Sequence, residues 1–475
     1  MPQKNRRRVG PPAMGGVLLT VAVLGAVGVI ALCYDRPAVS EIEKRELAAK
    51  PALTASALLS GSYTRELSNF FADTFPLREQ LVAFSGALSD LRGIRFNEIK
   101  IHEAKPDDGA VSAPAPIVSE APAVSSAPEE SAASSQSTEP APSEEVEAGV
   151  RNGSIIIYQN AGYQIFGGGD SMGQWYAQAI NRYEAEIGAK VRIYNLVVPS
   201  SIEFGLPERY RSATAAQRPK LQNIASSLDP GVEFINPYSA LDAHRDEYLY
   251  FHTDHHWTAL GAYYAYTAFA GQAGFEPVEL SSLERRTLEP FLGTLYSQTQ
   301  DTAMASHPDH VDYYIMPQDL SCCYFLKGSP FYGSHGPLYG EYAKSYNSYS
   351  VFLQGDIPVI RITNNGLVNG RRIAVVKESF GNAFVPWLVN HYEEVLVIDQ
   401  RYLERGFYGL LEEEGINELL FINNIFAAHT PVRIQEIESL PLRVYIPPEP
   451  ESSSEAEPEG ETPEAETKEE SEPQD

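Results

Sequence analysis

Short apolar runs alternate with amphipathic segments from residue 153 to residue 424, and this alternation constrains the fold more than any other feature. The runs have the length of buried strands, and the segments between them have helical spacing. Strands that alternate with helices form a mostly parallel sheet covered on both faces. The sequence therefore predicts an α/β fold. The expected strands are 154–158, 190–198, 232–235, 372–376, 394–398 and 418–423, and the expected helices are 172–187, 215–228, 257–271 and 382–391.

Residues 280–365 break this alternation. They are rich in Tyr, Gly and Ser, and no helical or strand period persists through them. We expect an insertion of loops and irregular strands here.

Two stretches lack the large apolar residues that a core needs. Residues 106–149 hold nine acidic residues and no Lys or Arg, and residues 447–475 hold twelve acidic residues and one lysine. Chains of this composition bury too little apolar surface to offset the entropy of ordering, so we expect both to be disordered. They account for most of the net charge of −27. Because the remainder shows no basic patch, the sequence does not indicate a nucleic-acid partner.

The N-terminus indicates a membrane anchor. Residues 13–33 form an apolar run that covers roughly 30 Å as a helix, enough to cross a bilayer. Four cations precede the run, which favours a cytoplasmic N-terminus and an extracellular main domain. A cleaved signal peptide is the alternative, although its apolar region is usually shorter. We expect a single-pass protein of the cell membrane; the preceding cations are Lys4, Arg6, Arg7 and Arg8.

These observations divide the chain into successive parts. We expect a cytoplasmic tail and transmembrane anchor, a short helical segment, a disordered acidic linker, one α/β domain and a disordered acidic tail. Their expected bounds are 1–34, 35–105, 106–149, 150–446 and 447–475.

The densest chemical feature is the segment Tyr250–Thr258, which holds three histidines within five residues. It lies between an extended segment and the expected helix 257–271, so an Asp–His pair can lie at the edge of the sheet. There Asp254 can fix the tautomer of an imidazole and support it as a general base. The alternative is a histidine-rich loop with Thr258 as a helix N-cap.

A second feature is a serine directly after the expected strand 372–376. Ser379 precedes a glycine and a helix, so it lies at the carboxyl end of the sheet, where open α/β folds bind ligands. The first N–H groups of that helix can face a developing oxyanion. The alternative role for such a serine is a helix N-cap.

The tetrapeptide Asp254-His255-His256-Trp257 resembles the signature after which the DHHW family is named. That family is similar to the SGNH-type proteins that O-acetylate alginate, which carry an Asp-x-His-Trp element and a later serine after a strand. The resemblance spans most of residues 40–440, apart from the acidic linker. It also covers segments 45–51, 73–78, 198–199 and 397–402.

The resemblance implies an SGNH-like three-layer α/β/α domain that carries Ser379 as nucleophile, His256 as base and Asp254 as the residue that orients it. The sequence departs from the commoner Asp-Ser-Phe pattern, because Glu378 precedes the serine. The backbone N–H groups of Ser379 and Gly381 are the expected oxyanion donors. No metal or cofactor is expected. The residues expected to contact the substrate are Trp257, His255, Asn382 and Arg401.

The function implied is that of an O-acetyltransferase or esterase acting on acyl esters of a cell-surface polysaccharide. The membrane is an expected partner through the N-terminal helix, and a membrane-embedded acyl donor protein is a candidate partner. A non-catalytic glycan-binding protein is the alternative, since 27 tyrosines suit sugar stacking. The two differ in whether Ser379 Oγ and His256 lie within hydrogen-bond reach.

Two other sites compete with this assignment. Ser171, in the sequence Gly-Asp-Ser, resembles the nucleophile of ordinary SGNH hydrolases, but no clear strand leads into it. The run His252–His256 is similar to the ligands of a metallo-hydrolase, although the other histidines are scattered. Cys322 and Cys323 are adjacent, which disfavours a disulfide between them, and without a CxxC pair zinc is not expected.

Overall fold

The computed structural model describes residues 153–446 without a break, residues 99–102, and single positions and short segments between residues 22 and 88. Nearly all of the expected transmembrane run 13–33 lies outside the described residues. So do the linker 106–149 and the tail 447–475, for which we predict disorder. Among the described residues, no helix combines the length and the apolarity needed to cross a bilayer.

The core of the fold is an eight-stranded, mostly parallel sheet in the order β11-β10-β12-β14-β13-β15-β6-β7. From β14 to β7 the neighbouring strands are parallel. Nearly every residue of the central strands is buried, which explains why they appear in the sequence as continuous apolar runs. The parallel strands are β6 (Arg192–Val198), β7 (Val232–Ile235), β13 (Arg372–Lys377), β14 (Glu394–Asp399) and β15 (Glu418–Asn424).

The other edge of the sheet is antiparallel and comes from the segment expected to be irregular. β12 pairs with β14, β10 with β12 and β11 with β10, all antiparallel. The expectation for residues 280–365 was therefore wrong for these strands, which are regular parts of the main sheet. An apolar run alone does not encode which strand lies beside it. The strands are β10 (Leu320–Phe325), β11 (Gly333–Gly336) and β12 (Val359–Asn364), and the same segment holds the hairpin β8 (Glu284–Phe291) and β9 (Asp309–Ile315).

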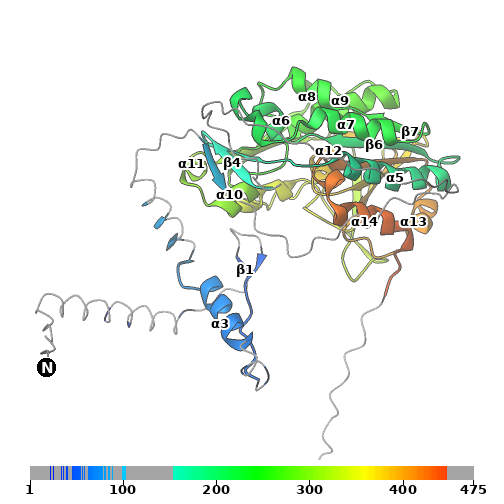
Figure 1. Cartoon of the computed structure of the whole chain (residues 1–475). Coiled ribbons are helices and arrows are strands. Elements are labelled where there is room, and N and C mark those ends of the chain that lie inside the picture. The colour runs from blue at the N-terminus through cyan, green and yellow to red at the C-terminus, as the bar shows by residue number, and fades with distance from the viewer. Residues whose placement is uncertain are drawn as a thin grey trace, which may run out of the picture.

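Helices cover both faces of the sheet. Tyr194 and Asn195 are neighbours on β6, so their side chains point to opposite faces. The ring of Tyr194 packs on Phe269 of α9 (Ala259–Ala273), whereas Asn195 donates a hydrogen bond of 2.7 Å to Tyr176 of α5 (Asp170–Ile187). Thus α9 and α5, both in the main body in Figure 1, lie on opposite sides.

The remaining helices extend these two layers or lie at the ends of the sheet. They are α6 (Ser201–Gly205), α7 (Gln217–Ser227), α8 (Tyr238–Ala243), α10 (Thr294–Thr299), α11 (Thr302–Ala305), α12 (Gly381–Leu388), α13 (Phe407–Glu413) and α14 (Pro431–Ser439), with 3-10 turns η1 (Glu208–Ala213), η2 (Leu280–Ser282), η3 (Ser345–Val351), η4 (Ala427–His429) and η5 (Leu440–Leu442).

A small three-stranded antiparallel sheet precedes the main sheet. β4 (Ile155–Tyr158) pairs with β3 (Ile99–His102) and with β5 (Ala161–Gln164). We expected residues 154–158 to be the first strand of the α/β alternation, but they do not join the main sheet. Ile156 packs instead with Ile165 in a separate small apolar cluster.

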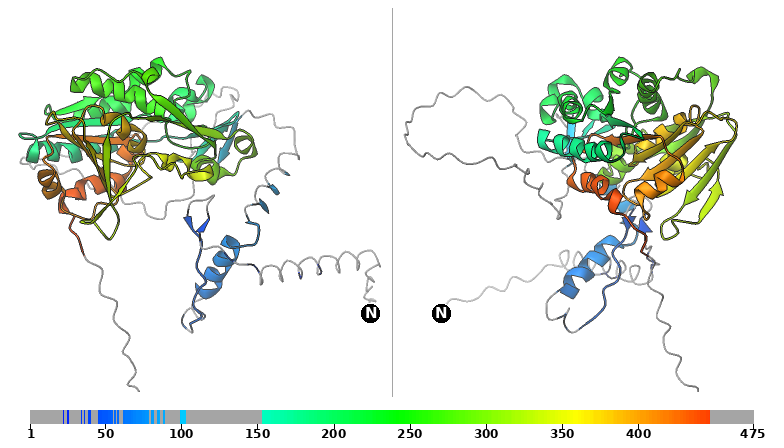
Figure 2. Two further views of the ribbon diagram at one scale, coloured as in Figure 1. Left: turned by 180° about the vertical axis from the view of Figure 1, so that it is seen from behind. Right: turned by 90° about the vertical axis from the view of Figure 1, so that its right-hand side faces the viewer.

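The N-terminal segment holds a short helix, α3 (Ser62–Asp73), and a pair of two-residue strands, β1 (Val39–Ser40) and β2 (Arg45–Glu46). None of the residues of α3 is buried. In both views of Figure 2, α3 and β1 lie below the main body of the molecule.

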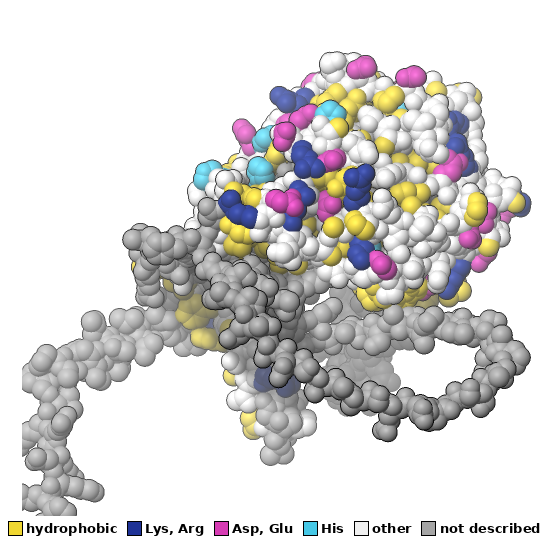
Figure 3. Space-filling view, turned by 45° about the horizontal axis from the view of Figure 1, so that its top comes forward, with side chains coloured by type: hydrophobic (Ala, Val, Ile, Leu, Met, Phe, Trp, Pro, Cys, Tyr) yellow, Lys and Arg dark blue, Asp and Glu magenta, His cyan; other side chains and the backbone are white. Residues whose placement is uncertain are grey.

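The outer surface carries charges of both signs. On the face shown in Figure 3, Lys and Arg side chains are interspersed with Asp and Glu side chains. Surface pairs such as Lys220–Asp170 and Arg286–Glu341 show the same pattern. This face therefore has no extended patch of one sign.

Candidate active site

The site lies at the carboxyl end of β13. The strand ends at Lys377, and Glu378, Ser379 and Phe380 form the turn into α12. β13 is apolar and buried between β14 and β15, so its end is held in place by neighbours on both sides. The last position before the helix presents Ser379 at the edge where parallel strands leave the sheet.

The loop that precedes α9 is held by a buried carboxylate. Asp309 on β9 accepts hydrogen bonds from the backbone N–H groups of His252 (3.0 Å) and Thr253 (2.7 Å). It also accepts hydroxyl hydrogen bonds from Thr253 (2.6 Å) and Tyr248 (2.5 Å). At the other end of the loop, Thr258 caps α9 through Gly261 N–H. The loop is therefore fixed on both sides of Asp254.

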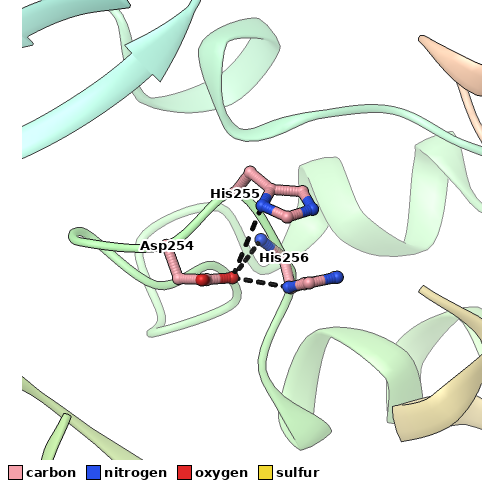
Figure 4. A group of neighbouring side chains, drawn as sticks. All are labelled: Asp254, His255 and His256. Carbon is pink, nitrogen blue, oxygen red and sulfur yellow. Dashed lines mark hydrogen bonds and ion pairs between the residues drawn. The ribbon is translucent and has the colours of Figure 1, made fainter. Parts of the chain in front are cut away.

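Asp254, His256 and Ser379 form a continuous hydrogen-bonded chain. Asp254 Oδ1 lies 2.5 Å from His256 Nδ1 and 3.0 Å from the backbone N of His256, as the dashed lines in Figure 4 show. His256 Nε2 lies 2.7 Å from Ser379 Oγ. Asp254 and His256 are buried, at 1% and 5% exposure, so the chain is shielded from water. These are the three residues that the sequence paired.

The second oxygen of Asp254 is also occupied. Asp254 Oδ2 accepts hydrogen bonds from the backbone N–H and the hydroxyl of Thr294, at 2.7 and 3.0 Å. With both oxygens engaged, the carboxylate has one orientation, in which Oδ1 faces the imidazole of His256. Such second contacts fix the ring and its tautomer.

Tyr349 on η3 supports the same imidazole from one face. Its ring is stacked on His256 with centroids 3.9 Å apart and 9° between the planes. Its hydroxyl donates to the carbonyl oxygen of Ser379 at 3.0 Å. Burial raises the pKa of Tyr349 well above its ordinary value, and the charges of Glu378 and Asp254 raise it further. The hydroxyl therefore stays protonated and remains a donor.

Sequence reasoning did not identify the supporting residues Tyr349, Thr294, Asp309 and Glu378 as part of the site. Three of them lie in the segment 280–365, where no local pattern marks them. Glu378 was noted only as a departure from a pattern, whereas in the structure its carboxylate lies 3.3 Å from Ser379 Oγ.

Of the two expected oxyanion donors, the N–H of Gly381 is already hydrogen-bonded and the N–H of Ser379 is not, among the described residues. The N–H of Gly381 donates to the carbonyl oxygen of Glu378 at 3.0 Å, so in this conformation it is not available to an oxyanion. The turn after Ser379 closes on itself, which consumes this donor. The N–H of Ser379 makes no hydrogen bond within the part of the chain that the structure describes.

Three of the four residues expected to contact the substrate are engaged in the protein itself. Trp257 is fully buried and donates its indole N–H to Phe380 O at 2.9 Å, so it joins the loop to the turn after Ser379. Asn382 is 1% exposed and donates to Asp356 at 2.9 Å. Arg401 makes two hydrogen bonds to Asp399 (2.8 and 2.7 Å). Trp257 and Asn382 are buried and Arg401 is partly exposed, and all three already have partners in the protein. Their contact with a substrate stays a prediction.

Asp356 links Asn382 and Arg401 in a partly exposed charge cluster beside the site. Burial alone would raise the pKa of Asp356, but the charges of Lys377 and Arg401 hold it well below its ordinary value. Arg401 lies 2.9 Å from Asp356, and Lys377 lies 2.7 Å from Asp399. The cluster fixes the end of β13 from the β14 side.

His255 is the expected contact residue that remains partly accessible, with 28% of its side chain exposed. Its ring lies against that of His256, with centroids 3.8 Å apart, and its Nδ1 is 2.5 Å from the Thr294 hydroxyl. It therefore borders the Asp–His pair on the solvent side.

A metal centre is the other chemistry that this cluster suggests. Asp254, His255 and His256 offer ligand atoms within 4.8 Å of one another, the only such group among the described residues. However, Asp254 Oδ1 and His256 Nδ1 are hydrogen-bonded to each other, and His256 Nε2 faces Ser379. The donor atoms thus point at protein partners and not at a common centre, so the arrangement fits a metal poorly.

Ser171, the alternative nucleophile, lies in the first turn of α5. It makes no hydrogen bond to a histidine or a carboxylate within the described residues. Asp170 beside it is paired with Lys220 at 2.7 Å. The structure therefore gives Ser171 no base.

Comparison with known proteins places the chain in a family. The family model described as DHHW protein matches residues 123–398, more than half of the chain. The chain belongs to the DHHW family. This confirms the resemblance carried by Asp254–Trp257, and in this chain the tetrapeptide lies in the loop that holds His256 against Ser379.

Solved structures agree with this assignment. A DHHW family protein from Eubacterium siraeum is 32% identical, with a TM-score of 0.57, over 62% of this chain and 97% of that one. PatB1 from Bacillus cereus, solved with a sulfonyl adduct, is 19% identical with a TM-score of 0.50, over 59% and 98% of the two chains. PatB1 without the adduct is 20% identical to this chain, with a TM-score of 0.51. At this identity PatB1 supports the fold alone. No curated protein matches the chain.

Proposed function

We propose that this DHHW protein is an SGNH-like acyl-ester enzyme that uses Ser379, His256 and Asp254 as a catalytic triad. One observation carries the proposal: Ser379 Oγ lies 2.7 Å from His256 Nε2, whose other ring nitrogen lies 2.5 Å from Asp254. A serine hydroxyl attacks an ester only when a base takes its proton, and this geometry supplies the base.

The reaction follows from these contacts. Ser379 Oγ attacks the carbonyl carbon of an acyl ester while His256 Nε2 takes the serine proton. Asp254 stabilises the imidazolium that forms, and the N–H of Ser379 is a donor for the oxyanion. The leaving alcohol departs with the proton from His256, which leaves an acyl-serine. Water or a sugar hydroxyl then gives its proton to His256 and attacks the acyl carbon. The bond from that carbon to Ser379 Oγ breaks as His256 returns the proton to Oγ, which restores the free serine.

We propose that the substrate is an O-acylated polysaccharide at the cell surface and that the chain is held there by its N-terminal apolar run. The family resemblance and the apolar residues 13–33 support this assignment. Transfer to a sugar and transfer to water share every residue described above, so the acceptor decides between transferase and esterase.

The direct test is an assay of residues 35–475 with an activated acetyl ester such as 4-nitrophenyl acetate. The parent chain should release the alcohol, Ser379→Ala and His256→Ala should lose at least ~10³-fold in rate, and Ser171→Ala should lose little. A chelator should leave the rate unchanged, because no step uses a metal. An inactive parent that still binds glycan would favour the glycan-binding alternative, and loss confined to Ser171→Ala would relocate the site.

A further inference from the structure

Glu378 is a buried carboxylate with a place in the site that the triad does not explain. It is 5% exposed and joins the ends of two parallel strands. Its Oε1 accepts a hydrogen bond of 2.9 Å from the backbone N–H of Asn424 at the end of β15. Its Oε2 accepts one of 3.1 Å from Phe380 N–H, in the turn after β13.

The same carboxylate contacts the serine hydroxyl. Ser379 Oγ lies 3.3 Å from Glu378 Oε2 and 2.7 Å from His256 Nε2, so its single proton has two acceptors. When His256 is neutral, the shorter contact takes the proton. When His256 carries a proton, its Nε2–H donates to Oγ, and the hydroxyl then donates to Glu378. Oγ is therefore held in place in both states of the histidine.

Glu378 also places a carboxylate beside Ser379 Oγ, the atom that His256 Nε2 faces. During acyl transfer His256 becomes an imidazolium, with Asp254 at Nδ1 and Glu378 near the atoms that Nε2 faces. All three side chains are at least nine-tenths buried, so their charges interact in a medium of low dielectric.

We propose that Glu378 is a positioning residue for the nucleophile, which locks the turn around Ser379 and holds its hydroxyl on His256 through both protonation states of the imidazole. This inference rests on the proposed function, because it takes Ser379 to be the nucleophile. A carboxylate near a developing oxyanion is electrostatically unfavourable. The positioning role explains why Glu378 nevertheless lies beside Ser379.

The test compares two buried glutamates at opposite ends of the same sheet. Glu378→Gln leaves one acceptor oxygen for two backbone donors and removes the acceptor of the serine proton. Glu418→Gln is the matched control, because Glu418 is also buried and accepts from Tyr392 (2.7 Å) and Arg371 (2.7 Å). It lies at the first residue of β15, away from Ser379.

The readout is the rate at which Ser379 reacts with phenylmethylsulfonyl fluoride, followed by mass spectrometry well below each variant's melting temperature. In this reaction Oγ bonds to sulfur, fluoride leaves and His256 takes the serine proton. We expect Glu378→Gln to react on the order of 10²-fold more slowly, because a misplaced nucleophile carries a cost of this size. Glu418→Gln should react like the parent chain even if its melting temperature falls equally.

Crystal structures of the parent and of Glu378→Gln give a second, activity-independent readout. Ser379 Oγ should leave hydrogen-bond distance of His256 Nε2 in the variant. A variant that reacts at the parent rate with Oγ still on His256 would overturn the positioning role. A parent that does not react at all would count against the proposed function, and the crystal structures alone would then decide the role of Glu378.

Discussion

Ser379 Oγ and His256 Nε2 lie 2.7 Å apart, although 123 residues separate the two in the sequence. β13 brings the serine to the carboxyl end of the sheet, and the loop before α9 brings the histidine to the same edge. Tyr349 then covers the ring of His256 and bonds the carbonyl of Ser379, so one side chain holds both partners. The Ser379–His256 pair is therefore held by three segments that are distant in the chain.

Asp254→Asn tests the orienting carboxylate. Asparagine can still accept from His256, but it carries no charge to stabilise the imidazolium. Its NH2 would then face the N–H of Thr294, donor against donor, so that hydrogen bond is lost. We expect kcat for an activated acetyl ester to fall on the order of 10⁴-fold with KM little changed. Asp312→Asn, at a partly exposed carboxylate on β9, is the control and should retain the parent rate. Equal rates for parent and Asp254→Asn would remove Asp254 from the mechanism.

Tyr349 makes two contacts in the site, a hydroxyl hydrogen bond to the Ser379 carbonyl and a ring stacked on His256, and two substitutions can distinguish them. Tyr349→Phe keeps the ring on His256 but leaves the Ser379 carbonyl without its donor, which costs about 1 kcal/mol or roughly fivefold in rate. Tyr349→Ala also removes the stacked ring and should lower kcat much further. Steady-state kinetics on both variants would check this order. Identical losses in the two would mean that the stacking has no effect on the reaction.

The sequence was informative about the parts of the fold whose pattern is local. The parallel strands and the helices α5, α7, α9 and α12 follow from apolar runs and helical spacing, because burial on one or both faces imposes those periods. Pairing is not local, so β4 was assigned to the wrong sheet and the antiparallel edge β10–β12 was not foreseen. The apolar residues of a strand indicate that the strand is buried, but they do not indicate which strand pairs with it.

The same distinction holds in the site. Asp254 and Ser379 stand next to clear structural boundaries, the start of a helix and the end of a strand, and their chemistry could be paired from the sequence. Tyr349 and Asp309 act through contacts across the fold, and nothing in their flanking residues marks them. Trp257 shows a contact that its sequence position did not predict: it is buried and donates its indole N–H to Phe380 O.

The opposite end of the sheet carries a pH-sensitive group that can be tested independently of activity. Burial and the neighbouring charge of Glu414 raise the pKa of Glu394 to about 7 from 4.5. A raised pKa means that the folded state prefers the protonated acid. This contribution to stability is complete below about pH 4.5 and is lost as the pH rises through 7.

Glu394→Gln should therefore flatten the pH dependence of unfolding. The stability of the parent relative to this variant should decline between pH 4.5 and pH 7 and then stay level, as measured by denaturant unfolding at several pH values. Two curves that run parallel across this range would show that Glu394 titrates normally in the folded protein.

The proposed location makes a topological prediction. If residues 13–33 cross the membrane with the N-terminus inside, a C-terminal epitope tag lies outside the cell. Protease added to intact cells should remove the tag and leave a cytoplasmic marker protein intact. A tag protected until the cells are permeabilised would rule out this orientation.

The central claim is that Ser379 carries the acyl group, and the most direct measurement is to trap it there. Residues 35–475 are mixed with an activated acetyl ester, quenched in acid within milliseconds to seconds, digested and analysed by tandem mass spectrometry. The account predicts one acetyl group on Ser379, formed more slowly in His256→Ala and absent from Ser379→Ala. An acetyl group on Ser171, or turnover of the ester with no acyl group on Ser379 at any time, would contradict it.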